Sequence, residues 1–472
     1  ADLMTKTLLH YTLYYYCTST YDFWKKRGVP GPRPLPVLGN TKDIMGVKTS
    51  VATFLQNIYE EYKNEPMVGL FMGRKPILVL NDPDLIKDVL IKDFPKFADR
   101  GFNTEPLSIH LFNLESERWR PLRSKLSPIF TSGKLKNMFP LIIECSDHLK
   151  TCLDKLVIKG EPVECRELTA KFTTDVIGTC AFGIDMNAMA EEDSEFRRMG
   201  RQIFAVSAET VFRLKMRQYL PKIYELLGYL RPIAGGACGT CRGPGLYVQT
   251  FGEREFPQEL TDSLLTAQAF VFFAAGFETS SSAMSNALYE LAQNHEVQDK
   301  LREEITEYFS KNNGQLKYED IKHMKYLDKV FKETLRKYPA GPILMRKTTS
   351  EYTFNDTKVS IPKQLILWIP IFPIHRDPNI YPNPDVFDPE RFNEDAIAAR
   401  HPMHYLPFGD GPRNCIGARF AVCQTKVGLM TILRNHKVHV CDKTTIPYEF
   451  DPGAFLLAPK GGIYVKMTKV EN

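Results

Sequence analysis

The stretch FGDGPRNCIG, residues 408–417, places a single cysteine inside a loop rich in glycine and proline and continues directly into a good helix start. Glycines such as Gly409 and Gly411 allow the backbone to approach a flat ligand closely. Cys415 stands at the predicted helix N-terminus with Arg413 close by in the sequence, a setting that lowers the thiol pKa and favours the thiolate. The sequence therefore predicts a rigidly held, anionic sulfur ligand at Cys415.

The surroundings of Cys415 narrow the kind of metal that it can bind. No second cysteine or histidine stands at zinc-finger spacing, since Cys423 follows eight residues later inside the predicted helix. A lone thiolate suits a haem iron whose other axial side stays open. We therefore interpret Cys415 as a candidate haem ligand.

The composition sets only broad limits. The chain has 472 residues, of which 43% are hydrophobic and 25% charged, an ordinary globular composition that supports a large core. The formal net charge of +5 is too small to argue for nucleic acid, and we predict no nucleic acid partner. Basic residues cluster at residues 118–125 and 134–136, either to dock an acidic protein or as solvated helix faces. The ten cysteines are dispersed, which favours a reducing compartment over a disulfide framework.

Residues 1–27 are interpreted as a membrane-anchor remnant with a basic flank. Residues 8–16 (LLHYTLYYY) are apolar and aromatic but far short of the roughly 20 residues that a membrane-spanning helix needs. Residues 24–27 (WKKR) add the positive charge typical of a cytoplasmic flank, and the proline-rich residues 29–36 form a stiff spacer. These features predict that residues 28–472 form a domain held on the cytosolic face of a membrane. The alternative is an irregular N-terminal arm.

Residues 260–294 form the clearest predicted helix, because Thr261 is a plausible N-cap and residues 262–294 contain no proline. Such a helix spans about 50 Å, enough to cross a whole domain. Residues 267–277 are apolar on nearly all sides, with Gln268 as the exception, and this pattern predicts burial on most faces. The polar residues from Glu278 onward exclude a membrane span.

The centre of this helix carries an unusual combination of residues. Residues 275–280 (AGFETS) bring a glycine, a carboxylate and a hydroxyl into an otherwise apolar region. Gly276 costs about 1 kcal/mol relative to alanine in a helix. The motif therefore marks either a functional distortion of the helix or a simple kink.

Two further segments complete the predicted fold. Residues 326–338 form a helix with Glu333 and Arg336 on one face, a pair that is a weak signal by itself. Residues 339–389 are rich in proline and contain short β-type runs, which predicts small sheets joined by an ordered meander. The sequence thus predicts a mainly α protein with small β-sheets and a long central helix.

Together, these motifs resemble those of the cytochrome P-450 family of haem-thiolate monooxygenases, over nearly the whole chain. Residues 408–417 match the family's haem-binding loop at every restricted position, which is a highly specific signal. The other matching motifs are the oxygen-activation motif at residues 275–280, the ExxR motif at residues 333–336, its partner PERF at residues 389–392, and the WxxxR pair Trp119 and Arg123. Residues 275–294 and 402–420 are most similar to insect microsomal members that act on foreign compounds.

The resemblance implies a P-450 fold with the long helix over haem b, and it assigns roles to individual residues. Cys415 is the proximal thiolate ligand of the iron, and Thr279 with Glu278 passes protons through water on the distal side. The cofactor-binding positions are Arg100, Trp119, Arg123, Ala275, Phe408, Arg413, Cys415 and Gly417. Among these, the family's propionate-holding groups fall on Arg413, Arg123 and Trp119, joined by Arg100. The buried structural triad of the family falls on Glu333, Arg336 and Arg391.

The resemblance also implies partners, substrates and a place in the cell. Electrons come from NADPH through a flavoprotein reductase that docks on a basic face including Arg120 and Lys125, with cytochrome b5 as an alternative donor. The expected location is the cytosolic face of the endoplasmic reticulum membrane. The expected substrates are lipophilic small molecules such as plant toxins, insecticides or endogenous lipids. By family position, the substrate cavity is lined by residues 102–112, 204–212, 270–274, 340–344 and 455–457.

Residues 231–258 depart from the family pattern. The family has two helices here that roof the substrate cavity, whereas this stretch is rich in glycine and proline, lacks helical periodicity and is too short for both. It is either a mis-joined segment or a real variant with an opened roof, and we expect rapid proteolysis within residues 231–254. Three functions therefore compete: an active monooxygenase, a haem-thiolate isomerase or lyase acting on peroxides, and a non-catalytic or defective haem-binding product. Thr279 and Glu278 argue against the second, and only the altered roof favours the third.

Overall fold

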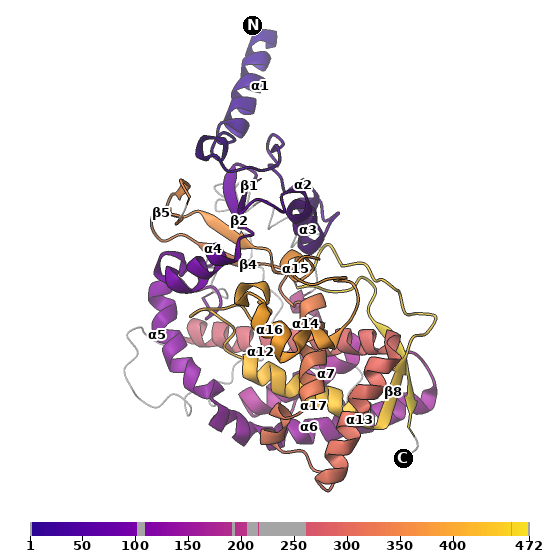
Figure 1. Ribbon diagram of the computed structural model, residues 1–472. Coiled ribbons are helices and arrows are strands. Elements are labelled where there is room, and N and C mark those ends of the chain that lie inside the picture. Colours follow the sequence, from indigo (N-terminus) through magenta and orange to yellow (C-terminus); the bar gives the residue numbers. More distant parts are fainter. Residues whose placement is uncertain are drawn as a thin grey trace.

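The structure, a computed structural model, describes residues 2–101, 109–190, 194–204, 216, 261–355, 357–454 and 456–470 (Figure 1). Helices dominate this part of the chain and the strands form small sheets, which confirms the predicted mainly α class. Residues 231–258 lie outside the described residues. The predictions of an opened roof and of rapid proteolysis concern these residues and therefore also fall outside the described part of the chain.

The described elements follow one another along the whole chain. The helices are α1 (Asp2–Thr18), α2 (Lys42–Met45), α3 (Val51–Glu61), α4 (Pro83–Lys87), α5 (Ser116–Leu126), α6 (Ser132–Lys159), α7 (Cys165–Ile177), α8 (Glu195–Phe204), α12 (Asp262–Gln293), α13 (His295–Lys311), α14 (Lys325–Lys337), α15 (Ile371–Ile374), α16 (Glu394–Ala399) and α17 (Ala418–Asn435). The strands are β1 (Met67–Met72), β2 (Lys75–Leu80), β3 (Val163–Glu164), β4 (Leu344–Lys347), β5 (Tyr352–Thr353), β6 (Ser360–Ile361), β7 (Ile366–Ile369), β8 (His436–His439) and β9 (Tyr464–Lys469). The bounds of α12 and α14 agree closely with the helices predicted over residues 260–294 and 326–338.

α12 is the central helix, and neighbouring helices cover most of its length. The side chain of Thr261 accepts a hydrogen bond from the Leu264 backbone N–H, so the predicted N-cap is confirmed. Gly276 allows α7 to pack closely, because a Cβ at this position would lie only 2.6 Å from Cδ1 of Ile177. The glycine therefore serves close helix packing, and α12 is α-helical through residue 276. The choice between a functional distortion and a simple kink stays a prediction.

The largest described sheet has the strand order β1-β2-β7-β4 and joins distant parts of the chain. β1 and β2 form an antiparallel hairpin, while β7 runs parallel to β2 and antiparallel to β4. In this register Arg346 of β4 is opposite Leu367 of β7, and the arginine is only 1% exposed. The smaller sheets have the orders β3-β9-β8 and β5-β6. The main sheet thus holds a buried arginine that no sequence motif indicates.

α1 stands away from the body of the protein (Figure 1). Apolar and aromatic side chains are exposed along this helix. The exposed side chains are Met4, Leu8, Tyr11, Leu13, Tyr14, Tyr15 and Tyr16. Trp24 ties the following segment to the main sheet, because its indole N–H donates to the Leu70 carbonyl oxygen at 2.9 Å. Among the residues that the structure describes, no helix combines the length and the apolar character needed to cross a bilayer.

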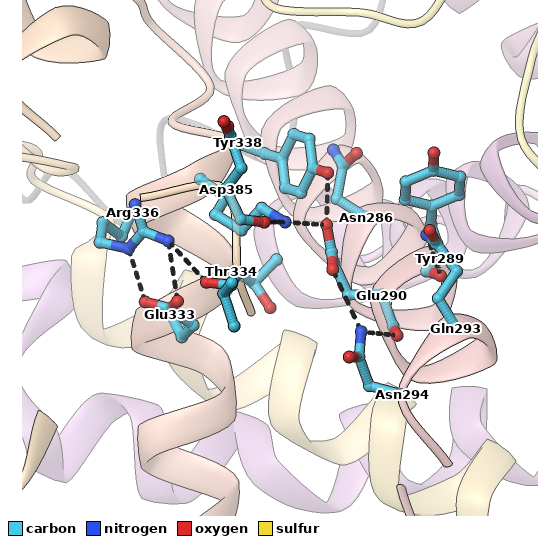
Figure 2. Close-up of polar contacts among 12 residues, drawn as sticks. Asn286, Tyr289, Glu290, Gln293, Asn294, Glu333, Thr334, Arg336, Tyr338 and Asp385 are labelled. Atoms are coloured by element: carbon cyan, nitrogen blue, oxygen red, sulfur yellow. Dashed lines mark hydrogen bonds and ion pairs between the residues drawn. The ribbon is translucent and has the colours of Figure 1, made fainter. Parts of the chain in front are cut away.

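Glu333 and Arg336 of α14 form a completely buried ion pair (Figure 2). Arg336 Nε donates to Glu333 Oε2 at 2.6 Å, and its Nη2 donates to Oε1 at 2.8 Å. The two terminal nitrogens also donate to the carbonyl oxygens of His375, at 2.9 Å, and Pro384, at 2.7 Å. Arg391 Nε lies 3.5 Å from the Glu333 carboxylate. The structure therefore brings the expected triad together and supplies its charges with partners.

A second buried charge pair joins α12 to α14 in the same region (Figure 2). Lys337 Nζ lies 2.7 Å from Oε1 of Glu290, and the Tyr338 hydroxyl donates to the same carboxylate. Lys337 also donates to the Asp385 carbonyl oxygen at 2.7 Å. Here too, a buried cation is paired with a buried carboxylate, so the contact connects two helices and neither charge is buried without a partner.

Candidate active site

The loop at residues 408–417 leads into α17 and is closed by its own backbone. The Cys415 N–H donates to the Phe408 carbonyl oxygen at 2.9 Å. Gly409 and Gly411 have φ angles of +67° and +73°, and a Cβ at Gly411 would lie 1.9 Å from the Leu90 carbonyl oxygen. The loop conformation therefore requires glycine at these positions, as the opening stretch of sequence indicates.

Cys415 is solvent-exposed, yet enough protein surrounds it that burial raises the pKa of its thiol. A hydrogen bond from the Gly417 N–H and the charges of Arg123 and Arg100 lower the pKa but do not prevail. The predicted lowering of the thiol pKa is therefore wrong, because the desolvation that outweighs these effects arises from the tertiary fold. A coordinated metal cation deprotonates a thiol outright, so Cys415 still suits a metal ligand.

Arg100 and Arg413, both predicted at the site, bind the same short segment, residues 109–114. Arg413 Nη2 donates to the Leu114 carbonyl oxygen at 2.6 Å, and Arg100 Nη1 donates to the Phe112 carbonyl oxygen at 3.4 Å. Arg100 Nη2 also donates to the carbonyl oxygen of Arg413 itself at 2.8 Å. The two arginines are therefore fixed to each other and to one stretch of backbone.

α5 supplies two more of the predicted residues. Trp119 is 4% exposed, and the guanidinium carbon of Arg413 lies 4.4 Å from the centre of its ring. Arg123 donates to the backbone and side-chain oxygens of Asn414 at 3.1 and 2.9 Å. Because Asn414 precedes Cys415 directly, Arg123 braces the cysteine loop from α5.

Arg346 of β4 is a site residue that sequence reasoning missed. Its Nη1 donates to the Met345 carbonyl oxygen, while its buried Nε and Nη2 have no hydrogen-bond partner in the described residues. Its charge contributes to lowering the pKa values of Arg100 and Arg413, so three guanidinium groups share one region. Only the pairing of β4 with β7 places it there, and a lone arginine in the sequence carries no such signal.

Among the described residues, none of these four arginines forms an ion pair with a carboxylate. Burial lowers the pKa of Arg413 to about 9 and that of Arg346 to about 10. Asp99 opposes this effect at Arg413, but its carboxylate accepts the Ser116 backbone N–H at 2.7 Å. Buried cations without counter-ions are costly, so the region fits a ligand that brings carboxylates of its own. With an exposed thiol nearby, these groups fit haem b and its propionates.

α12 presents Ala275 and Thr279 on one side and Glu278 on another. Ala275 is exposed although Ala274 next to it is buried, and the Thr279 hydroxyl donates to the Ala275 carbonyl oxygen at 2.8 Å. Glu278 is 4% exposed, and its carboxylate forms an ion pair with Arg166 of α7. The structure thus separates the two residues predicted to act in proton delivery, because the carboxylate is held against α7.

One hydrophobic cluster connects these parts of the site. It contains side chains of α5 together with Leu114, and both Phe272 of α12 and Ile416 of the cysteine loop pack against it. Phe408 packs against a neighbouring cluster formed by α12 and α14. Gly417 is the N-cap residue of α17 and places the cysteine directly before that helix. The fold therefore brings α5, α12 and the cysteine loop into one region.

The other predicted surfaces are described in part. Arg120 and Lys125 are exposed on α5. Of the expected cavity lining, residues 270–274 and 340–344 are mostly half-buried. Residues 102–108, 205–212 and 455 lie outside the described residues, so the full lining of the cavity stays a prediction.

Comparison with known proteins defines the protein family of this chain. A family model described as "Cytochrome P450" matches residues 29–227 and 247–467 of this chain. Because the match covers most of the chain, the chain belongs to the cytochrome P450 family. The expected fold is therefore confirmed, and the chain is a monooxygenase of the haem-thiolate type.

Curated relatives place the chain near insect members of the family. It is 40% identical to probable cytochrome P450 6a14 of Drosophila melanogaster over 491 aligned positions, which cover 95% of this chain and 96% of the relative. It is also 40% identical to cytochrome P450 6a2 of the same fly, over 95% of this chain and 96% of the relative. Cytochrome P450 6B1 of Papilio polyxenes is 37% identical over 98% of both chains. The predicted likeness to insect P450 enzymes is confirmed.

The comparisons also bear on the atypical segment. The family match leaves residues 228–246 unmatched, and most of these fall within residues 231–258. The 491 aligned positions exceed the 472 residues of the whole chain, so the first relative carries residues that this chain lacks. The nature of the segment, a real variant or a faulty join, stays a prediction.

Proposed function

We propose that this enzyme inserts one atom of dioxygen into lipophilic small molecules, either foreign compounds such as plant toxins and insecticides or endogenous lipids. Electrons reach it from NADPH through a flavoprotein reductase, with cytochrome b5 as an alternative donor. The observation that carries the proposal is an exposed cysteine, Cys415, among four arginines that lack carboxylate partners in the described residues. A haem with propionate groups and an iron that accepts a thiolate suits this set of side chains.

The chain's own residues hold haem b at defined points. Cys415 is the iron ligand, and the arginines that bind the propionates are Arg100, Arg346 and Arg413. Arg123 keeps the cysteine loop in place through Asn414, and its other N–H groups remain available for a carboxylate. When bound through a thiolate, haem supplies the activation of dioxygen and the cleavage of its O–O bond.

Thr279 and Glu278 have different roles in proton delivery. The Thr279 hydroxyl donates its one proton to the Ala275 carbonyl, so its oxygen is oriented to accept a hydrogen bond from a distal water. Glu278 supplies protons only when its carboxylate exchanges Arg166 for water, because the ion pair holds it against α7. Thr279 therefore orients the water that delivers the proton, whereas Glu278 controls how fast protons are replaced.

α1 and α5 supply the surfaces for the membrane and the reductase. We assign residues 1–27 to attachment at the endoplasmic reticulum membrane and residues 28–472 to the monooxygenase domain on its cytosolic side. The exposed aromatic side chains of α1 suit the interface between lipid and water. Arg120 and Lys125 are exposed on α5, where an acidic reductase can dock.

Turnover with isotopically labelled oxygen tests this proposal. Purified protein is mixed with an insect reductase, NADPH and a series of apolar probe substrates such as alkoxycoumarins, under ¹⁸O₂. We expect product that carries one ¹⁸O atom and forms only when reductase and NADPH are both present. A complete absence of NADPH-dependent product across the series would contradict the proposal.

A non-catalytic or defective haem protein is the second candidate, favoured by the unmatched residues 228–246. It predicts a thiolate-ligated haem spectrum together with NADPH oxidation that releases peroxide and yields no product. An isomerase or lyase would instead convert an organic hydroperoxide without NADPH or reductase. The match of Thr279 and Glu278 to the oxygen-activation motif argues against that third activity.

A further inference from the structure

Gln268 is the exception in the apolar part of α12, and it is almost completely buried, with 2% exposure. The Leu111 backbone N–H donates to its Oε1 at 2.8 Å. Its Nε2 donates to the carbonyl oxygens of Ile109, at 3.0 Å, and Leu264, at 3.2 Å. The side-chain amide therefore pairs with the backbone of residues 109–111 much as a neighbouring strand would.

The segment that Gln268 holds is also the segment that holds two arginines of the site. The Phe112 carbonyl oxygen accepts a hydrogen bond from Arg100, and the Leu114 carbonyl oxygen accepts one from Arg413. One side-chain amide thus fixes a backbone stretch that in turn fixes two guanidinium groups. A shift of this stretch moves the carbonyl oxygens that orient both arginines.

Gln268 also lies on the side of α12 that carries the oxygen-activation motif. Ala275 and Thr279 follow it by seven and eleven residues, which correspond to about two and three helical turns, so the three residues share one face. Phe272, one turn after Gln268, packs against the same hydrophobic cluster as Leu111. The contact between α12 and residues 109–114 therefore links the distal helix directly to the arginine cluster.

We infer that Gln268 is a positioning residue that fixes residues 109–114 against α12. It thereby sets the orientation of the arginines that bind the haem propionates, an inference that rests on the proposed haem site. It acts through the backbone of this segment and not on the reacting atoms. An apolar side chain in its place leaves the Leu111 N–H and the Ile109 carbonyl buried without partners. The segment then moves to satisfy these groups, and the arginines bound to it move as well.

Gln298 of α13 provides a matched control. It is 1% exposed, and its Nε2 donates to the carbonyl oxygens of Leu291, at 2.9 Å, and Val438, at 2.8 Å. The Val438 N–H donates to its Oε1 at 2.8 Å. Burial and bonding are thus closely similar to those of Gln268, but the backbone that Gln298 holds belongs to β8 and to the C-terminal end of α12, twelve residues after Thr279, where no site residue lies. Gln298→Leu removes an equal set of bonds away from the site.

The test compares Gln268→Leu with Gln298→Leu in the haem-loaded protein. The first measurement is the rate of haem transfer to apomyoglobin, followed by absorbance. The second is the position of the propionate bending bands in the resonance Raman spectrum, which report hydrogen bonds to these carboxylates. For Gln268→Leu we expect roughly tenfold faster haem transfer, because a buried donor and acceptor lose their partners, and shifted propionate bands. Gln298→Leu should keep wild-type values in both measurements while losing a similar amount of global stability.

Gln268→Glu replaces the leucine variant if that variant yields no holoprotein. It keeps an acceptor for the Leu111 N–H but loses both donors, so the same changes are expected in the same direction. Haem transfer and Raman bands like those of the wild type in the Gln268 variants, or equal changes in Gln298→Leu, would overturn the inference. Failure of the proposed function would show separately, as a wild-type protein without a thiolate-haem spectrum. Hydrogen exchange at the Leu111 amide, expected to be faster in Gln268→Leu, would then still decide whether Gln268 holds the segment, and unchanged exchange would refute it.

Discussion

Arg336 and Arg346 are buried to the same extent, at 0% and 1% exposure, but their surroundings differ. Two nitrogens of the Arg336 guanidinium, Nε and Nη2, donate to Glu333 (Figure 2). Its two terminal nitrogens also donate to the backbone carbonyl oxygens of His375 and Pro384. The guanidinium of Arg346 donates only to the carbonyl oxygen of Met345, and two of its nitrogens lack partners in the described residues. The protein itself therefore completes the bonding of the first arginine and leaves that of the second to another molecule.

The same contrast distinguishes two regions of the molecule. One is the framework, the buried charge pairs around Arg336 and Lys337, and the other is the candidate haem site around Cys415. Lys337 with Glu290 joins α14 to α12, whereas Arg336 with Glu333 is a pair within α14, and in both pairs the charges cancel locally. The arginines around Cys415 have no such carboxylates, and burial lowers their pKa values. An arrangement of this kind persists when a ligand supplies the missing charge. Buried cations in this chain can thus be sorted into structural and ligand-binding groups by their partners.

Arg336→Leu is expected to have the largest effect on stability. It leaves the Glu333 carboxylate buried without its main counter-ion, which costs about 3–5 kcal/mol in the free energy of unfolding. Urea unfolding followed by circular dichroism measures the loss, and we expect little holoprotein to be recovered. The double variant Glu333→Leu with Arg336→Leu should recover part of the stability. A single variant as stable as the wild type would remove Arg336 from the framework group.

Arg346→Met is expected to weaken haem binding without weakening the apoprotein. Loss of a charged hydrogen bond to a propionate corresponds to about 1.5–3 kcal/mol, or roughly tenfold to a hundredfold faster haem loss. The apoprotein should be as stable as the wild type or more stable, because a buried cation with unsatisfied N–H groups is removed. Haem transfer to apomyoglobin and urea unfolding of the apoprotein measure the two effects. A loss of apoprotein stability as large as that of Arg336→Leu would show that Arg346 stabilises the fold in the same way as Arg336.

Thr279→Ala tests the role of the distal face without altering the arginine cluster. We expect normal haem content but a lower yield of product per NADPH, with more peroxide released, because the hydroxyl that orients a distal water is missing. Thr173→Ala is a matched control, since the Thr173 hydroxyl of α7 also donates to an α12 carbonyl, that of Phe277, at 2.9 Å. NADPH oxidation and peroxide release are measured together. Equal coupling in the two variants would remove Thr279 from the mechanism.

A loss of stability at acid pH is a smaller expected effect. It involves one buried histidine in the framework and one near the candidate haem site. Burial lowers the pKa of His375, whose carbonyl oxygen accepts from Arg336, from 6.5 to about 3. It lowers the pKa of His110, which lies in the segment 109–114 that binds two site arginines, to about 4. Below pH 6.5 the unfolded chain binds protons that the folded histidines do not, so stability falls as the pH falls. Each histidine contributes a slope of up to about 1.4 kcal/mol per pH unit. His375→Gln should flatten the dependence between pH 6.5 and 5 in urea unfolding, and an unchanged slope would contradict the assignment.

The parts of the fold that were predictable from sequence have local causes. Thr261 caps α12, and the glycines at positions 409 and 411 adopt the left-handed conformation that their loop needs, because both features depend on a few neighbouring residues. Arg346 was not predictable, because its place in the site depends on the register of β4 with β7. The ion pair of Glu278 with Arg166 was missed for the same reason, since 112 residues separate the partners. The direction of the Cys415 pKa shift was wrong because burial, which decides it, is a property of the whole fold.

The reduced carbon monoxide difference spectrum of Cys415→Ala tests directly whether Cys415 is the ligand of the haem iron. Cys423→Ala is the matched control, because Cys423 is a free, buried cysteine in the second turn of α17. We predict that the wild type and Cys423→Ala show the Soret band typical of thiolate-ligated haem, and that Cys415→Ala loses this band while folded protein remains. A Cys415→Ala protein that keeps the thiolate band would contradict the assignment of Cys415 as the haem ligand.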